Sequence, residues 1–381
     1  MPADKMSIRN ALVKIKVFGV GGGGNNVLLR MLQSDFLDVE LVAVNTDAKQ
    51  LSTMQAAGIA SVQIGEMFTK GRGTGGKVEV GIQAAKNDAA KLKAKIKGAD
   101  LIFITAGMGG GTGTGVAPFI AEMAKDLGIL TIGVVTIPFS FEGNRKKRMA
   151  MEGIVKMQSH MDALIKVNND NLMKLPGNSS LSMVSAFKAA DEVLKQAIRC
   201  LAELILRIGF VNVDFADVVT VFRQSVSSDA LLGIGRSSKS AMEAVKQAVS
   251  SPLVERSLQG ARGIILNITG DSNLSLYDVN EATQYIMKTS DKDVNIIFGT
   301  IIDDNMHGDV QATVIATDFV DSMALKAPRL DSVPATTVTG EENKTDAPQT
   351  NDVLNTPGFM TKQRQPTNFA IPAFKLTPDK K

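Results

Sequence analysis

The chain has 381 residues, of which 44% are hydrophobic and 21% charged, and its formal net charge is +3. This balance, with no Trp and only two Tyr, argues against a surface dedicated to nucleic acid. One Cys and two His are too few for a typical zinc site or an internal disulfide. No apolar run approaches the roughly 20 residues of a membrane helix, so we expect no inserted segment. The single Cys fits a reducing cytosol.

The first half of the chain alternates between strand and helix patterns. The strand patterns cover residues 13–20, 41–44, 100–105 and 130–136, and the helix patterns cover 27–32, 78–96 and 117–127. Such alternation predicts an α/β, Rossmann-like parallel sheet with ligands bound at the carboxyl ends of its strands. Three glycine-rich segments fall at that edge: 19–26, 69–76 and 107–115. We expect these loops to converge on one phosphorylated ligand.

The segment Gly107–Gly115 is the most informative of the three. Because glycine has no Cβ, phosphate oxygens can approach its backbone N–H groups closely. The helix that follows would turn its positive end toward the same anion. A flexible linker is the alternative, but linkers seldom lie between a buried strand and a helix.

The segment Gly19–Gly24 contains G-x-G-x-x-G, and Asp47 lies near the end of the second strand. Both features also suit a dinucleotide-dependent oxidoreductase, in which an acidic residue binds a ribose hydroxyl. The second glycine loop, Gly107–Gly115, argues against an oxidoreductase, because one pyrophosphate needs only one such loop. The sequence contains no G-x-x-x-x-G-K-[ST] motif, which argues against a Walker-type P-loop.

Polar side chains between these segments suit recognition of a nucleoside. Glu142 can accept hydrogen bonds from ribose hydroxyls, while Asn169 and Asp191 can pair with base edges. Phe187 precedes Asp191 by one helical turn and could stack on a base. The basic run 144–148 suits either a phosphate contact or a solvated helix start.

The second half of the chain begins with a long helix pattern over residues 183–208. Cys200 falls on its apolar side, so we expect an inert buried thiol. A smaller α+β domain follows, beginning near 218–222, with helices over 240–249 and 276–287 and strands over 263–268, 294–299 and 310–316. From about residue 327 to 367 the composition predicts disorder. The apolar run 369–375 is typical of a short recognition peptide, although a terminus without function is the alternative.

The segment Asn212–Asp217 carries two carboxylates three residues apart, Asp214 and Asp217. They share a face if a helix begins there, and they could then polarise a water molecule or help to place a cation. Capping of that helix by Asp214 is the simpler interpretation when the segment is considered alone.

Taken together, these motifs resemble the tubulin/FtsZ family, and the FtsZ proteins within it. Gly109–Gly115 matches the family's G-G-G-T-G-T-G signature in full. Four further segments match family loops in the expected order: 19–26, 45–47, 139–143 and 212–217. The similarity runs from about residue 14 to 319, and 371–375 looks like the family's adaptor-binding peptide.

The resemblance implies a cytoplasmic GTPase that polymerises head to tail and forms the bacterial division ring beneath the inner membrane. It implies GTP or GDP as ligand, with Mg²⁺ held through the phosphates. The implied GTP-binding residues are Gly22, Gly23, Gly24, Asn25, Asn26, Gly109, Gly110, Gly111, Thr112, Gly113, Thr114, Glu142, Lys146, Asn169, Phe187 and Asp191. Asn212, Asp214 and Asp217 would enter the next subunit's nucleotide site and activate the attacking water. Ile371, Pro372, Phe374 and Lys375 would bind membrane adaptors and division regulators.

The implied domain organisation has six parts. They are an N-terminal extension (1–12), a GTP-binding domain (13–182), a central helix (183–208), a C-terminal activation domain (209–326), a disordered linker (327–367) and an adaptor peptide (368–381). A divergent tubulin-like GTPase with another cellular role is the main alternative. Departures from the usual FtsZ pattern occur at Lys49, Lys77-Val78, Asn168 and 227–232, and Lys146 stands where Arg is common. They leave the nucleotide loops intact and bear on hydrolysis rate, ribose contacts and filament dynamics.

Overall fold

A computed structural model describes residues 13–33, 39–175, 181–206, 213–225, 227–254 and 256–319. The chain divides into a unit of residues 1–328 and a second unit of residues 329–381, and all described residues belong to the first. The predicted extension, linker and adaptor peptide, with Ile371, Pro372, Phe374 and Lys375, lie outside the described residues, as does Asn212. Within the described part, no helix is long and apolar enough to span a membrane.

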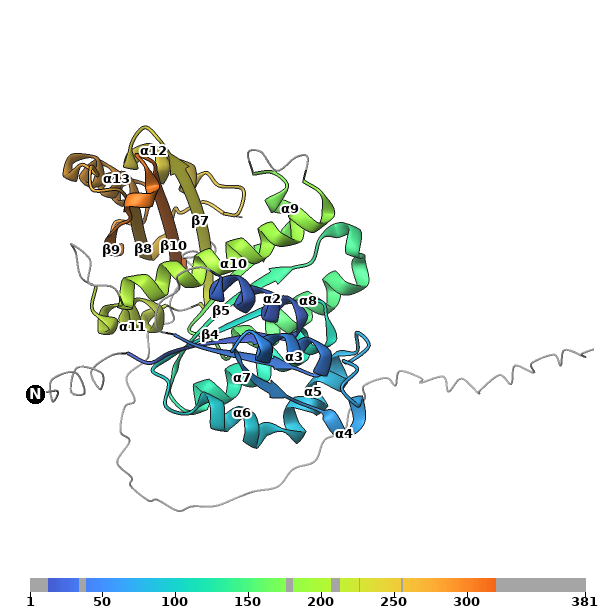
Figure 1. Ribbon diagram of the computed structural model, residues 1–381. Helices are drawn as coiled ribbons and strands as arrows, with labels where there is room; N and C mark the ends of the chain where they lie inside the picture. The colour runs from blue at the N-terminus through green and yellow to red at the C-terminus, as the bar shows by residue number, and fades with distance from the viewer. Residues whose placement is uncertain are drawn as a thin grey trace, which may run out of the picture. The chain divides into compact units, whose positions relative to one another are not determined.

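The architecture is built on ten strands in the order β3-β2-β1-β4-β5-β6-β7-β10-β8-β9. Figure 1 shows β4 and β5 in one part of the molecule and β7, β8, β9 and β10 in the other. The first six in that order are parallel and confirm the predicted α/β sheet. Their bounds are β1 (Ile15–Val20), β2 (Glu40–Asn45), β3 (Ala60–Gln63), β4 (Leu101–Gly107), β5 (Leu130–Ile137) and β6 (Ala163–Asn168). Strand β4 is buried along almost its whole length, as expected for a parallel strand covered on both faces.

The second half of the sheet is mixed and forms the predicted smaller α+β part. Its strands are β7 (Asp229–Ser237), β8 (Ala261–Gly270), β9 (Asn295–Ile302) and β10 (Val310–Phe319). Strand β10 pairs antiparallel with β7 and β8, while β8 and β9 are parallel. The sequence patterns do not include β7, which contains Gly233 and Gly235. In the structure both glycines let the helix at 241–249 pack closely, since a Cβ on either would strike its backbone.

Two helices begin inside the glycine segments rather than after them. The helices are α2 (Gly21–Leu32) and α7 (Gly111–Asp126), whereas the sequence predicted starts at residues 27 and 117. Glycine costs about 1 kcal/mol in a helix, which makes it a poor sequence signal for helix. Packing decides here, because a Cβ on Gly113 would lie 2.7 Å from the Gly107 carbonyl oxygen. The predicted glycine loops are therefore largely the first turns of helices.

The remaining helices of the first half are α3 (Ala48–Ala56), α4 (Glu66–Thr69), α5 (Val78–Asn87), α6 (Ala89–Ile96), α8 (Asn144–Gln158) and α9 (Asn169–Leu172), with a 3₁₀ turn η1 (Ser140–Glu142). The predicted helix over 78–96 is wrong as one piece. It is split into α5 and α6 at Asp88, whose carboxylate accepts a hydrogen bond from the Gly65 amide at 2.7 Å. That long-range bond fixes a break that no local pattern indicates.

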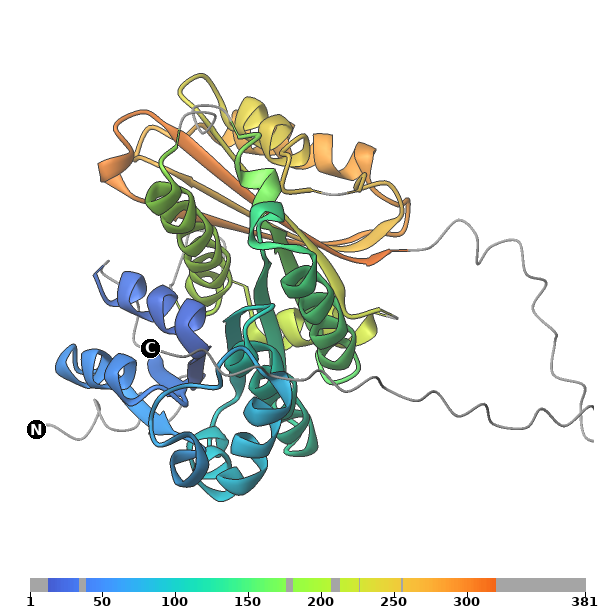
Figure 2. The same cartoon turned by 90° about the vertical axis from the view of Figure 1, so that its right-hand side faces the viewer.

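The long helix α10 (Met183–Leu206) runs between the parallel sheet and the C-terminal strands (Figures 1 and 2). Its apolar stripe joins one core with Ile132 of β5 and with Ile265 and Ile315 of the C-terminal strands. Cys200 is buried in this core, and burial raises the pKa of its thiol to about 12. The expectation of an inert thiol therefore agrees with the structure.

Helix α11 (Phe215–Gln224) packs on the same face of the C-terminal strands as α10. Helices α12 (Ala241–Val249) and α13 (Leu276–Thr289) cover the opposite face, and a second 3₁₀ turn, η2 (Asp304–Met306), precedes β10. Each half of the sheet is thus covered on both faces, and the carboxyl ends of β1, β4 and β5 remain open to a cavity.

Candidate nucleotide site

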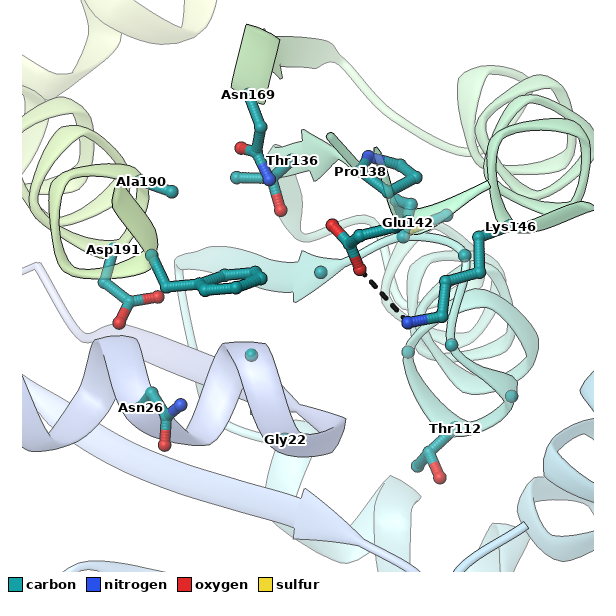
Figure 3. Close-up of a pocket in the computed structure, with 18 of the residues that line it drawn as sticks. Gly22, Asn26, Thr112, Thr136, Pro138, Glu142, Lys146, Asn169, Ala190 and Asp191 are labelled. Carbon is teal, nitrogen blue, oxygen red and sulfur yellow. Dashed lines mark hydrogen bonds and ion pairs between the residues drawn. The ribbon is translucent and has the colours of Figure 1, made fainter. Parts of the chain in front are cut away.

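A cavity of about 410 Å³ lies at the carboxyl ends of the parallel strands. It is bordered by the first turns of α2 and α7, by η1 and the start of α8, and by one side of α10 (Figure 3). Its lining consists of Gly22, Gly23, Asn26, Thr74, Gly107, Met108, Gly109, Gly110, Gly111, Thr112, Gly113, Thr136, Pro138, Glu142, Lys146, Asn169, Phe187, Ala190 and Asp191. The structure therefore brings together most of the residues singled out from the sequence.

The two glycine-started helices turn uncapped N-termini toward this cavity. Val20 and Gly110 occupy the N-cap positions, and neither provides a side-chain cap. No acidic residue lies in the first turn of either helix. The first N–H groups of a helix have no intrahelical partner and carry the positive end of its dipole. This end of the cavity is therefore suited to an anion such as a polyphosphate.

A buried polar network holds the first turn of α2 in place. The Asn25 amide donates to the Gly19 carbonyl at 2.8 Å, and Asn45 donates to Asn25 at 2.7 Å. Asn45 also donates to Gln50, whose amide reaches the Gly22 carbonyl at 3.3 Å. The structure thus gives Asn25 a supporting place in this network, beneath the cavity lining.

Two other residues of the predicted GTP-binding set also lie outside the lining. Gly24 packs against the Thr105 carbonyl of β4, where a Cβ would collide. The Thr114 hydroxyl accepts a hydrogen bond from the Gly109 amide at 2.8 Å and so braces the turn that precedes α7. The position of these two residues in the motif predicts direct contact with GTP. In the structure, both residues support the wall of the cavity.

Asn26, Asn169 and Asp191 lie at the end of the cavity nearest α10 (Figure 3). Phe187 of α10 also lines the cavity. Asn169 is only 4% exposed, and its Oδ1 has no hydrogen-bond partner among the described residues. An unpaired buried amide oxygen costs free energy, and such orphans are rare in folded proteins. The departure at Asn168 has a local role, since its side chain accepts from the Asp170 amide and caps α9.

Asp191 pairs with Arg30 of α2, with Oδ2 and Nε 3.0 Å apart. Burial raises the pKa of the Asp191 carboxyl, and the hydrogen bond and charge of Arg30 oppose that rise. Phe187 lies edge-on to the Phe139 ring, with centroids 5.3 Å apart. Both α10 side chains are thus held by other elements.

Glu142 and Lys146 form an ion pair at the side of the cavity, with Oε2 and Nζ 3.1 Å apart (Figure 3). The other Glu142 oxygen accepts from the Phe139 amide at 3.0 Å. The lining also contains residues outside the predicted GTP-binding set: Thr74, Gly107, Met108, Thr136, Pro138 and Ala190. Gly107 and Met108 belong to the segment Gly107–Gly115, which the sequence already indicated as an anion site. Thr74 belongs to the glycine segment 69–76, so the sequence carried a signal for it.

The acidic pair lies elsewhere, at the start of α11. Asp214 and Asp217 are exposed, and neither lines the cavity of its own subunit. Asp214 Oδ1 accepts from the Ala216 amide at 3.3 Å, so the capping interpretation is confirmed. In the described part of the chain neither carboxylate forms an ion pair with a cation.

Asp47, which in the sequence suited a dinucleotide-dependent oxidoreductase, has a structural role. Its carboxylate accepts from the Lys49 and Gln50 amides and caps α3, outside the cavity lining. Lys49 itself is exposed and enters this cap only through its backbone. The arrangement removes the ribose-binding acid that a dinucleotide enzyme needs at this position.

Comparison with known proteins gives a class that agrees with this site. Residues 14–177 match the Tubulin/FtsZ family, GTPase domain, and residues 228–320 match the FtsZ family, C-terminal domain. The fold and the cavity thus define a GTPase of the tubulin/FtsZ class.

Solved structures narrow the class to a family. An empty FtsZ dimer from M. jannaschii is 38% identical over 83% of this chain and 92% of that chain, with a TM-score of 0.76. A mutant FtsZ from M. jannaschii is also 38% identical, over 84% and 96% of the two chains, with a TM-score of 0.78. The chain belongs to the FtsZ family and is a polymerising GTPase.

A more distant structure shares the fold alone. CetZ2 from Haloferax volcanii, solved as a GTPγS-bound protofilament, is 22% identical over 82% of this chain and 95% of that chain, with a TM-score of 0.69.

Proposed function

We propose that the cavity binds GTP with its phosphates on the first turns of α2 and α7 and its guanine beside α10. The observation that carries this proposal is the pair of uncapped helix N-termini at one end of a cavity whose other end holds an unpaired Asn169 oxygen. Gly22, Gly23 and Gly109–Gly113 then face the phosphates. Glu142 accepts from the ribose, Lys146 supplies a nearby positive charge, and Asn26, Asn169 and Asp191 pair with the base while Phe187 packs against it.

The same proposal divides the active site between two subunits. Asp214 and Asp217 of one subunit, together with Asn212, enter the cavity of the next subunit in a head-to-tail filament. A carboxylate there accepts a proton from water as the water oxygen attacks the terminal phosphorus, so that GDP and inorganic phosphate leave. The exposed position of both carboxylates, outside their own subunit's cavity, favours this arrangement.

Mg²⁺ fits this site only as a partner of the nucleotide. Within the described residues, no cluster of three or more acidic, His or Cys side chains could hold a metal. Mg²⁺ prefers oxygen ligands and is commonly bound through substrate phosphates, where it neutralises their charge. We therefore assign it to the GTP phosphates rather than to a site made by the protein alone.

The shared site predicts a threshold in the dependence of hydrolysis on protein concentration. Below the concentration at which subunits associate, each cavity lacks its carboxylates, so the rate per subunit should be close to zero. Above it the rate per subunit should rise steeply, in step with the amount of protein that pellets in GTP. A rate per subunit that stays constant on dilution would contradict shared-site catalysis.

Acid should weaken nucleotide binding at a pH above the range in which an ordinary aspartate titrates. The guanine N–H groups need an ionised Asp191, and the pKa of this carboxyl is raised by burial. In the nucleotide-free protein the raised pKa means that this group favours the fold at low pH, and that this contribution is lost as pH rises through it. GTPγS affinity measured from about pH 7 to about pH 4 checks the prediction. Asp191→Asn should bind more weakly at neutral pH and lack this step, and an identical midpoint in both proteins would contradict it.

The cellular role follows from family membership and from the tail. We propose assembly into a division ring at the cytoplasmic side of the membrane, with 371–375 as the peptide that binds membrane adaptors and division regulators. The six-part domain organisation, with the central helix over 183–208, belongs to this proposal. Deletion of residues 369–381 should remove adaptor binding and leave GTP-dependent pelleting intact, and loss of pelleting would give the tail another role.

A further inference from the structure

Helix α11 is linked to the parallel half of the sheet at the end opposite its acidic pair. Asp214 caps the beginning of the helix and Asp217 lies in its first turn, whereas Arg223 lies in its last turn. Arg223 Nη2 donates a hydrogen bond to the Gly128 carbonyl at 2.8 Å. Gly128 belongs to the turn that ends α7, where the helix dipole also favours a cation. Arg223 therefore joins α11 to the far end of the helix whose first turn lines the cavity.

The segment that follows α11 is held by the same half of the sheet. The Asp229 carboxylate accepts from Gln158 Nε2 at 2.6 Å and from Lys166 Nζ at 2.7 Å. The Leu164 amide donates to the Ser228 carbonyl, and β6 and β7 pair at only two positions. Gln158 ends α8 and Lys166 belongs to β6, and both elements reach the cavity at their other ends. Three elements that border the cavity, α7, α8 and β6, thus hold α11 and the chain that follows it.

The link through Arg223 can be removed without leaving a buried charge. Arg223 and Gly128 are both exposed, so the freed carbonyl returns to water. Lys166 and Asp229 are partly buried, with 23% and 31% of their side chains exposed, and removal of either would leave the other charge unpaired there. Arg223 is therefore the contact at which the attachment of α11 can be tested alone.

Head-to-tail assembly gives this attachment a consequence for hydrolysis. Each cavity receives the carboxylates of the next subunit, so the distance from a subunit's own cavity to its own carboxylates decides where they arrive. Helix α7 has 16 residues and is about 24 Å long, and Asp214 lies about 14 Å along α11 from Arg223. A shift where the two helices meet displaces the carboxylates. Displacement by about 1 Å can slow a reaction about 100-fold.

We propose that Arg223 is a positioning residue for GTP hydrolysis, which holds α11 at the end of α7 and so places Asp214 and Asp217 in the cavity of the neighbouring subunit. The inference rests on the proposed function, which assigns both carboxylates to that cavity. Arg223 does not line the cavity of its own subunit and acts through α11. Its loss therefore slows hydrolysis in the filament and leaves nucleotide binding by the single subunit unchanged.

The first test compares Arg223→Met, which removes the donor and keeps an apolar stem, with Arg223→Lys, which keeps a cation that can donate. Above the assembly threshold, Arg223→Met should hydrolyse GTP about 10-fold more slowly per pelleted subunit, as expected for loss of one hydrogen bond from a charged group. Its affinity for GTPγS below the threshold should not change. Arg223→Lys should be faster than Arg223→Met, and equal rates for these two variants would overturn the hydrogen bond as the cause.

Gln224→Met is the matched control. Gln224 is exposed in the same last turn, and its side chain forms no hydrogen bond in the part of the chain that the structure describes. Its replacement should leave the rate per pelleted subunit unaltered. A loss equal to that of Arg223→Met would overturn the proposal, as would an Arg223→Met rate equal to that of the unaltered chain.

Mixed filaments show in which half of the shared site Arg223 acts. Asn169→Leu should lose GTP and keep its carboxylates, whereas Asp217→Asn should keep GTP and lack the base. Because the cavity of Arg223→Met is intact, mixing it with Asn169→Leu should raise the rate several-fold above the sum of the separate rates. Mixing it with Asp217→Asn should give no gain, since no interface then combines bound GTP with correctly placed carboxylates. The opposite pattern, or a gain in neither mixture, would overturn the proposal.

The mixture of Asn169→Leu with Asp217→Asn is the reference for these measurements. Absence of a gain in the reference mixture would contradict the shared site and with it the proposed function. A gain in the reference mixture, without the expected pattern for Arg223→Met, would overturn only the inference about Arg223. The two failures are therefore distinguishable.

Discussion

Asp217→Asn should bind GTP as tightly as the unaltered chain and hydrolyse it about 100-fold more slowly or worse, since a positioned general base contributes on that scale. Asp217 is exposed and forms no ion pair within the described residues, so its replacement should leave the fold intact. GTP affinity and phosphate release check the first two statements, and retained GTP affinity and GTP-dependent pelleting of the same preparation check that the fold is intact. A normal rate of phosphate release above the assembly threshold would exclude Asp217 as the base.

Two substitutions of Asp214 separate the two roles of its carboxylate, in capping α11 and in hydrolysis. Its carboxylate caps α11 through the Ala216 amide, and Asn caps helices about as well as Asp. Asp214→Asn should therefore keep the stability of the fold and lose hydrolysis. Asp214→Ala should lose hydrolysis and also about 1 kcal/mol of stability. Equal rates for Asp214→Asn and the unaltered chain would reduce this residue to its capping role.

Asn169→Leu should weaken GTP binding roughly 10- to 100-fold, because a site built to hydrogen-bond a base edge discriminates strongly against loss of that bond. The same change should raise the free energy of unfolding of the nucleotide-free protein by about 1 kcal/mol, because it removes an unpaired buried oxygen. Urea unfolding without nucleotide and GTPγS binding measure the two effects. Weaker GTPγS binding together with a higher free energy of unfolding would identify Asn169 as a ligand-binding residue. A structural residue would instead lose stability when it is replaced.

Thr105→Val is the matched control for Asn169→Leu. The Thr105 hydroxyl is also buried without a partner in the described part of the chain, yet Thr105 does not line the cavity. Its replacement by Val, a side chain of equal shape, should change the free energy of unfolding and leave the affinity for GTPγS unaltered. A similar loss of affinity in both variants would show that the Asn169 effect is indirect.

The parallel sheet and its ligand edge follow from the sequence because strands such as Leu101–Gly107 combine apolar runs with glycine at their carboxyl ends. The helix starts do not follow, since the glycines at 21–24 and 111–115 oppose helix by local propensity and are used for contacts with β4 and α5. Strand β7, which the sequence patterns do not include, likewise contains glycines, Gly233 and Gly235, that allow close packing of α12. In each case a glycine that reads as a loop signal permits close packing in the fold.

Part of the candidate site can likewise be predicted from the local sequence, and part of it cannot. Side chains with distinctive chemistry, such as Asn169 and Asp191, can be chosen from the motif and do line the cavity. The separation of Asn25 and Thr114 from the lining depends on hydrogen bonds to Gly19 and Gly109, which local sequence does not encode. The pairing of Asp191 with Arg30 joins α10 to α2 and likewise needs the tertiary fold.

The shared active site is tested most directly by mixing two inactive proteins. Asn169→Leu holds GTP poorly and keeps its carboxylates, whereas Asp217→Asn holds GTP and lacks the base. In a mixed head-to-tail filament, GTP on an Asp217→Asn subunit meets the intact carboxylate of an Asn169→Leu neighbour. An equal mixture should then reach up to about one quarter of the unaltered rate, because random order places the two intact halves together at about one interface in four. A mixture no faster than the sum of its separate components would contradict the account.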